Sequence, residues 1–579
     1  MKTEAESTIV DYLLEHGTTR ADHPVLILAD ERRITYGELT ARVLATAERI
    51  REIGLPVSSR IGLWFVEGEW IDYAVGYFAA LLSGAVAVVL PTDTDARTVR
   101  VILRDFGVGV VLCSPTSPLS QNGVTSVAVS NGAPVHRPYG HASGVMDPGS
   151  LADVIFTSGS TGAPKGVAAD HGLLRRMADT YRGRTKGAAT VAVGVSHSTA
   201  IGTRQLLLSA VARGSTLAVS VPFEPRSFLR LVAASSASTA VVPAAAGRAL
   251  VRALQDDATL CPPGLRTLRL ISDHLRPDTH RALAACLPGT RVINVYGLTE
   301  AGDAHLVTTE EDCHLGPGGW PAPGTEVAVM SDVGEWAGVG EEGNICLRDR
   351  LPVFSYPTDP AAGARTWREG WTITADLGSV DAAGRVSLTG RDTGLVRIGG
   401  RTVAVARVQA MLESIPGVDA AAVVALPHPT LGQSLAAVVA APEGVDTDAL
   451  NQTLADVLPG HAVLSPVVTV GALPLSRTGK PHQNAVLALI RQRLSASSRP
   501  CATPTELLVA GLWQQVLELD GPPGADANFF QLGGDSLTAV EVLAALESEI
   551  GIAVPMTVLF NTASAAECAK ALDLLTGAS

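Results

Sequence analysis

The chain has 579 residues and a mass of 59.8 kDa, which is too long for one compact core and predicts three or more domains. Hydrophobic residues make up 46 %, charged residues 17 %, and mean hydropathy is +0.25, which excludes a disordered or fibrous chain. A net charge of −13 argues against nucleic-acid binding. Seven cysteines without a CxxC pair favour a cytoplasmic location over a disulfide scaffold or a zinc site, and residues 1–20 predict no signal peptide.

Residues 73–92 contain no charged side chain and are long enough for a membrane-spanning helix. The stretch is interrupted by Ser83 and Gly84, and a β-rich run follows at residues 86–90 before Pro91. This pattern predicts a buried helix, a tight turn and a buried strand, and no membrane span.

Most of the chain alternates short apolar runs with helical patterns, which is typical of α/β layers. Strands are expected at residues 60–66, 110–113, 153–156, 239–242 and 291–296. A turn-rich joint is expected at residues 388–394. A second unit of about 100 residues follows it, with strands at 420–426 and 435–441.

Residues 494–503 are small and polar and predict a linker. Thr503 and Glu506 then have the spacing of a capping box, with Pro504 at the first helical position. The last unit has a helical pattern that places Leu507 and Val540 among its apolar positions, and it predicts a small helical bundle. The predicted boundaries give units 1–391, 392–493 and 504–579, joined by the linker.

The strongest local motif is a glycine-rich loop that follows an apolar strand at residues 155–167. Its hydroxyls, amides and one cation suit phosphate oxygens. The spacing is not that of a Walker A loop, because no serine or threonine follows the lysine. A polar turn after a strand is the alternative interpretation. The candidate phosphate ligands are Thr157, Ser158, Gly159, Ser160, Thr161, Gly162 and Lys165.

Lysine is rare, with five lysines beside 39 arginines. Two of them, Lys165 and Lys480, lie in glycine-containing loops. An ammonium group is a compact, mobile point charge that a guanidinium does not reproduce, so these two positions are candidates for a specific role.

Several motifs occur in an order that identifies a family. They are ITYGEL at 34–39, the segment 81–91, the loop 157–166, NVYGLTE at 294–300, TADL at 374–377, GR at 390–391 and the loop that ends at Lys480. The set resembles adenylate-forming enzymes, more specifically the adenylation domains of nonribosomal peptide synthetases. FFQLGGDSL at 529–537 looks like a peptidyl carrier protein, so the resemblance covers nearly the whole chain.

The resemblance implies an α/β adenylate-forming fold with a large N-terminal and a small mobile C-terminal subdomain, followed by an all-α carrier four-helix bundle. The adenylation core would be residues 1–391, its C-terminal subdomain 392–493 and the carrier 504–579. The implied cofactors are ATP, Mg²⁺ and 4′-phosphopantetheine.

The resemblance also implies roles for single residues. The loop at 157–165 would hold the pyrophosphate, Thr299 would contact the α-phosphate, and Glu300 would help to hold Mg²⁺. Lys480 would reach the bridge between the acyl group and the phosphate. The remaining ATP-binding residues would be Asn294, Tyr296, Gly297, Asp376 and Arg391, with Tyr296 near the adenine, Asp376 on the ribose hydroxyls and Arg391 near the ribose and the hinge. Taken singly, such carboxylates are usually solvated or capping groups, and such a tyrosine is usually a core aromatic.

Ser536 is the predicted attachment site of phosphopantetheine, by the same resemblance. It follows two glycines and an aspartate and precedes an apolar-periodic helix. A helix N-terminus favours a phosphate, because its free amides and its dipole attract an anion. Taken alone, a serine in this position is usually only an N-cap.

Three motif positions depart from the family. Leu298 stands where the family often has proline, and the segment at 271–274 reads ISDH where the family commonly has Gly-Gly-Glu-Ala. The hinge motif usually reads Gly-Arg-x-Asp, but here Thr393 takes the aspartate position and Asp392 comes one residue early.

The predicted substrate pocket lacks the aspartate that usually binds the α-ammonium group of an amino acid. A gap-free alignment back from Gly214 places Ile201 there, with Gly202 and Gln205 near it, whereas an insertion would place His197 and Ser198 at the Phe-Asp positions. A buried ammonium without a counter-charge is costly, so either the substrate has no α-ammonium or another carboxylate replaces the missing one.

Asp303 is the candidate replacement, unless it pairs with Arg269. If Asp303 binds the amine, the substrate would be an unusual amino acid, for example one whose amine is displaced from the α-position. The other expected pocket residues are Ala245, Arg269, Ile271, Val295 and Ala304.

The sequence therefore predicts a free-standing didomain that forms an acyl-adenylate and loads it on its own carrier. No condensation domain fits before residue 30 and no thioesterase after the carrier. The expected partners are the acid, a phosphopantetheinyl transferase, a downstream condensation or tailoring enzyme in trans and an MbtH-like helper, with no nucleic acid and no membrane. The alternatives are a fatty or aryl acid ligase fused to a carrier, and a degenerate scaffold.

Overall fold

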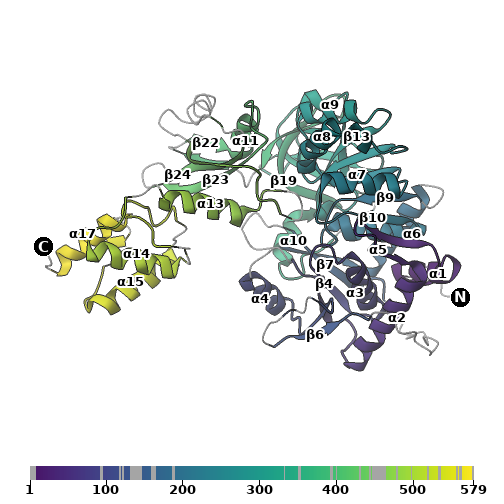
Figure 1. Cartoon of the computed structure of the whole chain (residues 1–579), viewed down its shortest axis with the longest axis horizontal. Helices are drawn as coiled ribbons and strands as arrows, with labels where there is room; N and C mark the ends of the chain where they lie inside the picture. Colours follow the sequence, from purple (N-terminus) through teal and green to yellow (C-terminus); the bar gives the residue numbers. More distant parts are fainter. Residues whose placement is uncertain are drawn as a thin grey trace. The chain divides into compact units, whose positions relative to one another are not determined.

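The computed structural model describes residues 8–576 except 92–95, 117–118, 120–122, 131–146, 158–164, 185–188, 332, 350–353, 392–394, 399–400, 429–431, 442–444, 446–463, 477–479, 497–498, 518, 520, 533–535, 556–557 and 560–563. It divides into two compact units (Figure 1). The first contains residues Met1–Thr389 with Ser476–Lys480, and the second contains Gly390–Leu475 with Pro481–Ser579.

The first unit contains a mostly parallel sheet with the strand order β6-β5-β3-β4-β7-β8, in which only the pair β7–β8 is antiparallel. The predicted strands at 60–66, 110–113 and 153–156 are confirmed as members of it. Its bounds are β3 (Arg60–Trp64), β4 (Val86–Val89), β5 (Val110–Cys113), β6 (Thr125–Ala128), β7 (Leu151–Thr157) and β8 (Lys165–Asp170).

A second sheet of the same unit has the order β16-β17-β19-β20-β15-β14-β13-β12-β11-β9-β10-β1-β2, with β18 paired to β19. Its centre, from β9 to β13, is parallel, and the predicted strands at 239–242 and 291–296 are confirmed there. The bounds are β1 (Pro24–Leu28), β2 (Arg33–Thr35), β9 (Thr190–Val193), β10 (Thr216–Val219), β11 (Thr239–Pro243), β12 (Thr267–Ile271), β13 (Arg291–Gly297), β14 (His305–Thr309), β15 (Gly318–Pro321), β16 (Glu326–Met330), β17 (Gly343–Arg348), β18 (Trp367–Arg368), β19 (Trp371–Val380) and β20 (Val386–Arg391).

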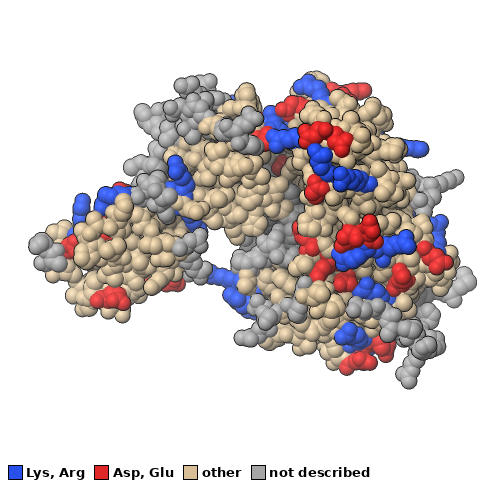
Figure 2. All heavy atoms as spheres, in the orientation of Figure 1, with Lys and Arg blue, Asp and Glu red and all other residues tan. Residues whose placement is uncertain are grey.

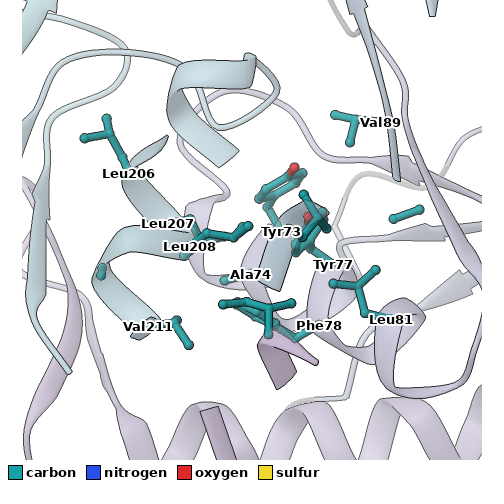
Figure 3. Close-up of a cluster of buried hydrophobic side chains, with 14 of the residues drawn as sticks. Tyr73, Ala74, Tyr77, Phe78, Leu81, Val89, Leu206, Leu207, Leu208 and Val211 are labelled. Atoms are coloured by element: carbon teal, nitrogen blue, oxygen red, sulfur yellow. The ribbon is translucent and has the colours of Figure 1, made fainter. Parts of the chain in front are cut away.

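The uncharged stretch at 73–92 folds as predicted. Helix α3 (Trp70–Leu82) is buried on nearly all sides, Gly84 makes the turn with φ +74°, and β4 follows. The helix belongs to an apolar cluster with residues of both sheets, and Figure 3 shows Tyr73, Ala74, Tyr77 and Phe78 of α3 in it. A helix in such a place has no polar face, which explains its composition. Among the described residues, no helix is long and apolar enough to cross a membrane.

The other helices of the first unit pack on the two sheets. They are α1 (Ile9–Thr19), α2 (Tyr36–Glu52), α4 (Ala96–Asp105), α5 (His171–Arg184), the π-helix η2 (Ile201–Leu207), α6 (Leu208–Arg213), α7 (Pro225–Ala234), α8 (Gly247–Asp256), α9 (Pro277–Cys286) and α10 (Pro360–Thr366), with 3₁₀ turns η3 (Ala244–Ala246), η4 (Ala258–Leu260), η5 (Thr299–Ala301) and η6 (Cys313–Leu315).

The second unit begins with a small sheet of order β22-β21-β24-β23, in which β25 pairs with β24. The predicted strands at 420–426 and 435–441 are confirmed as β23 and β24. The joint expected at 388–394 is not all turn, because β20 continues through Arg391, and residues 392–394 lie outside the described residues. The bounds are β21 (Leu395–Ile398), β22 (Arg401–Ala404), α11 (Val405–Glu413), β23 (Ala420–His428), β24 (Gly432–Ala440), β25 (Leu464–Val470) and α13 (Gln483–Ala496).

Helix α13 extends to Ala496, three residues into the predicted linker, because Leu494 continues the apolar spacing set by the buried Ile490. The capping box beyond the linker is present: Thr503 Oγ1 accepts from Glu506 N at 3.1 Å. Arg499 donates to the Glu506 carboxylate at 2.8 Å, and this bond, together with donation from the amides of Ala502 and Thr503, lowers the pKa of Glu506 to about 2.

The C-terminal region is helical as predicted. Its described helices are α14 (Pro504–Val516), α15 (Ser536–Ile550) and α17 (Ala565–Thr576), and the fourth helix of the expected bundle stays a prediction. Trp513 packs on Phe529 with ring centroids 5.0 Å apart. Leu507 and Val540 are exposed and not buried, because each lies about 100° around its helix from the face that packs.

Charged side chains of both signs are interspersed over the described residues on the face shown in Figure 2, without a continuous basic surface there.

Candidate active site

The carboxylate and the backbone carbonyl of Glu300 both accept hydrogen bonds from other parts of the first unit. It lies on η5, the turn that follows β13. Its carboxylate Oε1 accepts from Tyr356 Oη at 3.0 Å and Thr157 Oγ1 at 3.4 Å. Its carbonyl accepts from Trp367 Nε1 at 3.0 Å and Thr372 Oγ1 at 3.3 Å. Burial, reinforced by the Glu300 charge, raises the pKa of Tyr356, so this phenol stays a donor.

Lys165 and Thr157 face each other at the end of the β7–β8 hairpin, where their Cα atoms are register partners. The Lys165 ammonium lies 5.9 Å from the centroid of the Tyr356 ring. A cation, a hydroxyl and a carboxylate are thus collected around one tyrosine. The predicted phosphate ligands Ser158, Gly159, Ser160, Thr161 and Gly162 lie outside the described residues.

Two predicted nucleotide ligands meet across the second sheet. Asp376 on β19 is buried, and its Oδ2 accepts from Tyr296 Oη at 2.5 Å. The backbone amide of Asp376 donates to Thr374 Oγ1 at 3.0 Å, which orients this part of the strand. Tyr296 is therefore more than a core aromatic, because its hydroxyl carries a specific contact. A carboxylate in this position can accept from two neighbouring hydroxyls.

Asn294 holds a turn instead of facing an open space. Its Oδ1 accepts from Leu275 N at 3.1 Å, and its Nδ2 donates to the carbonyls of Leu270 and Asp273 at 3.1 and 2.9 Å. Within this turn Ser272 has φ +75°, a left-handed conformation that favours glycine. Ser272 takes the position of the second glycine in the Gly-Gly-Glu-Ala motif that is common in the family. Its backbone is therefore strained, and the Asn294 contacts hold it in this conformation.

The expected substrate pocket assembles in part. Ile201, Ile271 and Val295 belong to one apolar cluster, although they come from η2, β12 and β13. Gln205 Nε2 donates to the carbonyl of Gly302 at 3.2 Å. Of the remaining expected residues, Gly202 and Ala304 are buried, Arg269 is half-buried and Ala245 is exposed.

His197 lies in the core against α3. Its ring stacks on Tyr73 with centroids 4.3 Å apart and meets the edge of Trp70 at 5.8 Å. Its Nε2 is 3.2 Å from the carbonyl of Val66. This packing explains the conformation of His197 without a substrate contact.

Asp303, three residues after Glu300, lines a small pocket. Its amide donates to Asp349 Oδ2 at 3.2 Å, and its carbonyl accepts from His305 Nδ1 at 2.6 Å. The pocket is lined by Leu173, Met177, Glu300, Ala301, Gly302, Asp303, Asp349, Phe354, Gly370 and Thr372. Acidic and apolar groups therefore share its wall, which suits a ligand with a cationic group on an apolar frame.

The other predicted residues have these positions. Thr299 begins η5, and Gly297 ends β13. Ser476 N donates to the Lys480 carbonyl at 2.7 Å. Arg391 ends β20 and Ser536 begins α15, and both side chains lie outside the described residues.

Sequence reasoning missed Tyr356, Trp367 and the buried pair Asp153–Arg204. The pair had a signal, because each residue is a single charge within an apolar segment. Tyr356 and Trp367 had none, because their contacts are to residues distant in sequence.

This fold is shared by a family of AMP-binding enzymes. Residues 13–355 match the family described as AMP-binding enzyme, and residues 407–480 match the AMP-binding enzyme C-terminal domain. The first match covers more than half of the chain, so the chain belongs to the AMP-binding enzyme family. Residues 508–572 match the family described as phosphopantetheine attachment site, which adds a carrier domain.

Known relatives are large synthetases. Phosphinothricin tripeptide synthetase PhsC of Streptomyces viridochromogenes is 29 % identical over 589 residues, which cover 95 % of this chain and 51 % of that protein. Phenyloxazoline synthase MbtB of Mycobacterium sp. (strain MCS) is 28 % identical over 552 residues, which cover 90 % and 46 %. The chain spans about half the length of these two relatives.

Solved structures share the fold. o-Succinylbenzoate CoA synthetase (MenE) from Bacillus subtilis in complex with its acyl-adenylate intermediate has a TM-score of 0.68 at 20 % identity and covers 82 % of this chain and 97 % of its own. ATP-bound MatB from Rhodopseudomonas palustris has a TM-score of 0.67 at 23 % identity and covers 83 % and 98 %.

Proposed function

We propose that this chain activates a carboxylic acid with ATP and transfers it as a thioester to phosphopantetheine on Ser536, for the biosynthesis of a nonribosomal peptide or a related natural product. The observation that carries the proposal is the meeting of Thr157, Lys165 and Tyr356 around Glu300, within a chain that also has a carrier domain. A scaffold without activity has no need for these groups together.

The first step is adenylate formation. The acid's carboxylate oxygen attacks the α-phosphorus of ATP, and pyrophosphate leaves with the electron pair of the broken P–O bond. Lys165 neutralises charge on the phosphates, and Lys480 does so at the acyl-phosphate bridge. Asp376 accepts from the ribose hydroxyls, while Tyr296 orients its carboxylate.

Glu300 fits a role in holding Mg²⁺, because a carboxylate oxygen is a ligand that this ion prefers, and Thr157 and Tyr356 restrict its rotation. When bound, the ion neutralises charge on phosphate oxygens. In the second step the pantetheine thiolate attacks the acyl carbon, the bond to the AMP oxygen breaks, and AMP leaves with its electron pair. The thiol proton goes to water.

The substrate we propose is an unusual amino acid whose amine is bound by Asp303. Support comes from the position of Asp303 in a pocket with Glu300 and Asp349, and from the missing amine-binding aspartate, which neither the alignment on Ile201 nor the one on Ser198 supplies. An ammonium in an enclosed site needs such a counter-charge.

Replacing Asp303 with asparagine tests this assignment. For an amine-bearing acid we expect KM in pyrophosphate exchange to rise about tenfold or more, because a charge-assisted hydrogen bond is lost. The same acid without its amine serves as the control and should be used equally by both proteins. Unchanged affinity of Asp303→Asn for the amine-bearing acid removes the assignment.

The partners we propose follow from the carrier. A phosphopantetheinyl transferase modifies Ser536, and a condensation or tailoring enzyme receives the acyl group in trans. An MbtH-like helper and a cytoplasmic location belong to the same proposal.

Intact-protein mass spectrometry tests the function and identifies the acid. The phosphopantetheinylated chain is incubated with ATP, Mg²⁺ and pooled proteinogenic, β-amino, aryl and short aliphatic acids. We expect a mass gain equal to one acyl group, which Lys480→Ala loses. A gain from a fatty or aryl acid would instead support the ligase alternative, which Leu298 and the missing aspartate favour. No gain with any acid, with and without a helper, would favour a scaffold.

A further inference from the structure

An ion pair is buried completely in the first unit, between η2 and β7. Arg204 is 1 % exposed and Asp153 is 0 % exposed. Arg204 Nη2 lies 2.6 Å from Asp153 Oδ1, and its Nε lies 3.2 and 3.3 Å from the two carboxylate oxygens. Tyr77 on α3, drawn in Figure 3, donates to Asp153 Oδ2 at 2.9 Å.

Stability alone is a weak reason for such a pair. Removing two charges from water is costly, and a well-packed apolar pair is often as stable in the same place. Arg204, however, contacts both the β7–β8 hairpin, which ends at Thr157 and Lys165, and Phe354, which packs beside the turn that follows Glu300.

One guanidinium holds both strands of the hairpin that ends at Thr157 and Lys165. Nη2 binds Asp153 on β7 and also donates to the carbonyl of Val167 on β8 at 2.8 Å. β7 ends at Thr157 and β8 begins at Lys165. The planar fork of arginine can reach both strands at once, whereas the single ammonium of lysine cannot match it.

The other face of Arg204 contacts the Glu300 side of the site. Its guanidinium carbon lies 4.9 Å from the centroid of Phe354. Phe354 packs so closely on Gly302 that a Cβ there would come within 2.9 Å of the ring, and Gly302 has φ +63°. The next residue on the π-helix, Gln205, donates to the Gly302 carbonyl at 3.2 Å.

We propose that Arg204, through Asp153, is a positioning residue that sets the Thr157–Lys165 end of the hairpin relative to Glu300 and to η2, the helix that carries the predicted pocket residues Ile201, Gly202 and Gln205. The π-helical geometry of η2 agrees with such a role, because π-turns are frequent at functional sites. This inference rests on the proposed function, since it assigns the hairpin end to the phosphates of ATP. The contacts of the nucleoside at Asp376 and Tyr296 should not depend on it.

The test compares ATP with AMP. The double variant Asp153→Leu with Arg204→Met replaces the pair by apolar side chains of similar length, and binding is measured by calorimetry with Mg²⁺ and without acid. We expect Kd for ATP to rise about tenfold or more, because displacement of positioning groups by ~1 Å has effects of this size or larger. Kd for AMP should change less than about twofold, and the melting temperature by only a few degrees.

Two further variants complete the design. Arg204→Lys keeps the charge and loses the fork, so it should fold and show a smaller loss of ATP affinity with AMP unchanged. It decides the question if the double variant does not fold. The matched control replaces a partly exposed pair of the same unit, Arg42 and Asp72, whose atoms lie 2.5 Å apart, with Met and Leu. Binding of both nucleotides to this control should equal that of the wild type.

The inference is overturned if a folded pair variant binds ATP as the wild type does, or if it loses ATP and AMP affinity in equal proportion. A failure of the proposed function looks different, since the wild-type chain would then bind neither nucleotide.

Discussion

Replacement of Ser536 with alanine is expected to abolish acyl loading while adenylate formation continues at nearly the wild-type rate. The hydroxyl is the atom that forms the phosphodiester with phosphopantetheine, so its removal leaves no thiol to accept the acyl group. Ser536 is none of the groups assigned to adenylate formation, so this substitution leaves that step intact. Intact-protein mass spectrometry measures loading, and pyrophosphate exchange measures adenylate formation.

A matched control is available in the same helix. Thr538 of α15 also carries a hydroxyl, and Thr538→Ala should accept phosphopantetheine and the acyl group like the wild type. An acyl thioester that persists on Ser536→Ala would place the attachment site elsewhere and contradict the carrier assignment.

The second large effect concerns Asp376. We expect Asp376→Asn to lower kcat/KM for ATP on the order of 100-fold, since two charge-assisted hydrogen bonds to the ribose would each weaken by about 1.5 kcal/mol. The discrimination between ATP and 2′-deoxy-ATP should fall in the same variant, because the lost partner is the ribose hydroxyl.

Tyr296→Phe serves as the graded comparison. It retains the ring but loses the hydroxyl that donates to Asp376 Oδ2. We expect a loss of about fivefold, the effect of one neutral donor that orients a carboxylate. If Asp376→Asn still prefers ATP over its 2′-deoxy form as strongly as the wild type, Asp376 does not bind the ribose.

Local chemistry made several elements predictable. The uncharged run at 73–92 encodes a helix, a glycine turn and a strand, and the Thr503–Glu506 spacing encodes a helix start. These features depend on neighbours within a few residues, so the pattern of side chains is sufficient. The prediction was less accurate at two places. Helix α13 ends about one turn later than expected, and Leu507 and Val540 lie on the exposed face of their helices.

The sequence predicted which residues belong to the site better than it predicted which of them are hydrogen-bonded to each other. The ordered motifs indicated Glu300, Lys165, Tyr296 and Asp376, but not that Tyr296 donates to Asp376 or that Asn294 holds the turn at Ser272. The predicted phosphate ligands from 158 to 162 are outside the described residues, and their roles stay predictions.

The sequence by itself determined the class of the protein, because the residue types and the order of its motifs can be read without knowing how the chain packs. Only the tertiary structure decided which side chains meet. Asp153 and Arg204 are 51 residues apart, and Thr157 and Glu300 are 143 apart. Such contacts depend on strand register and on the packing of helices over sheets, which no local spacing encodes.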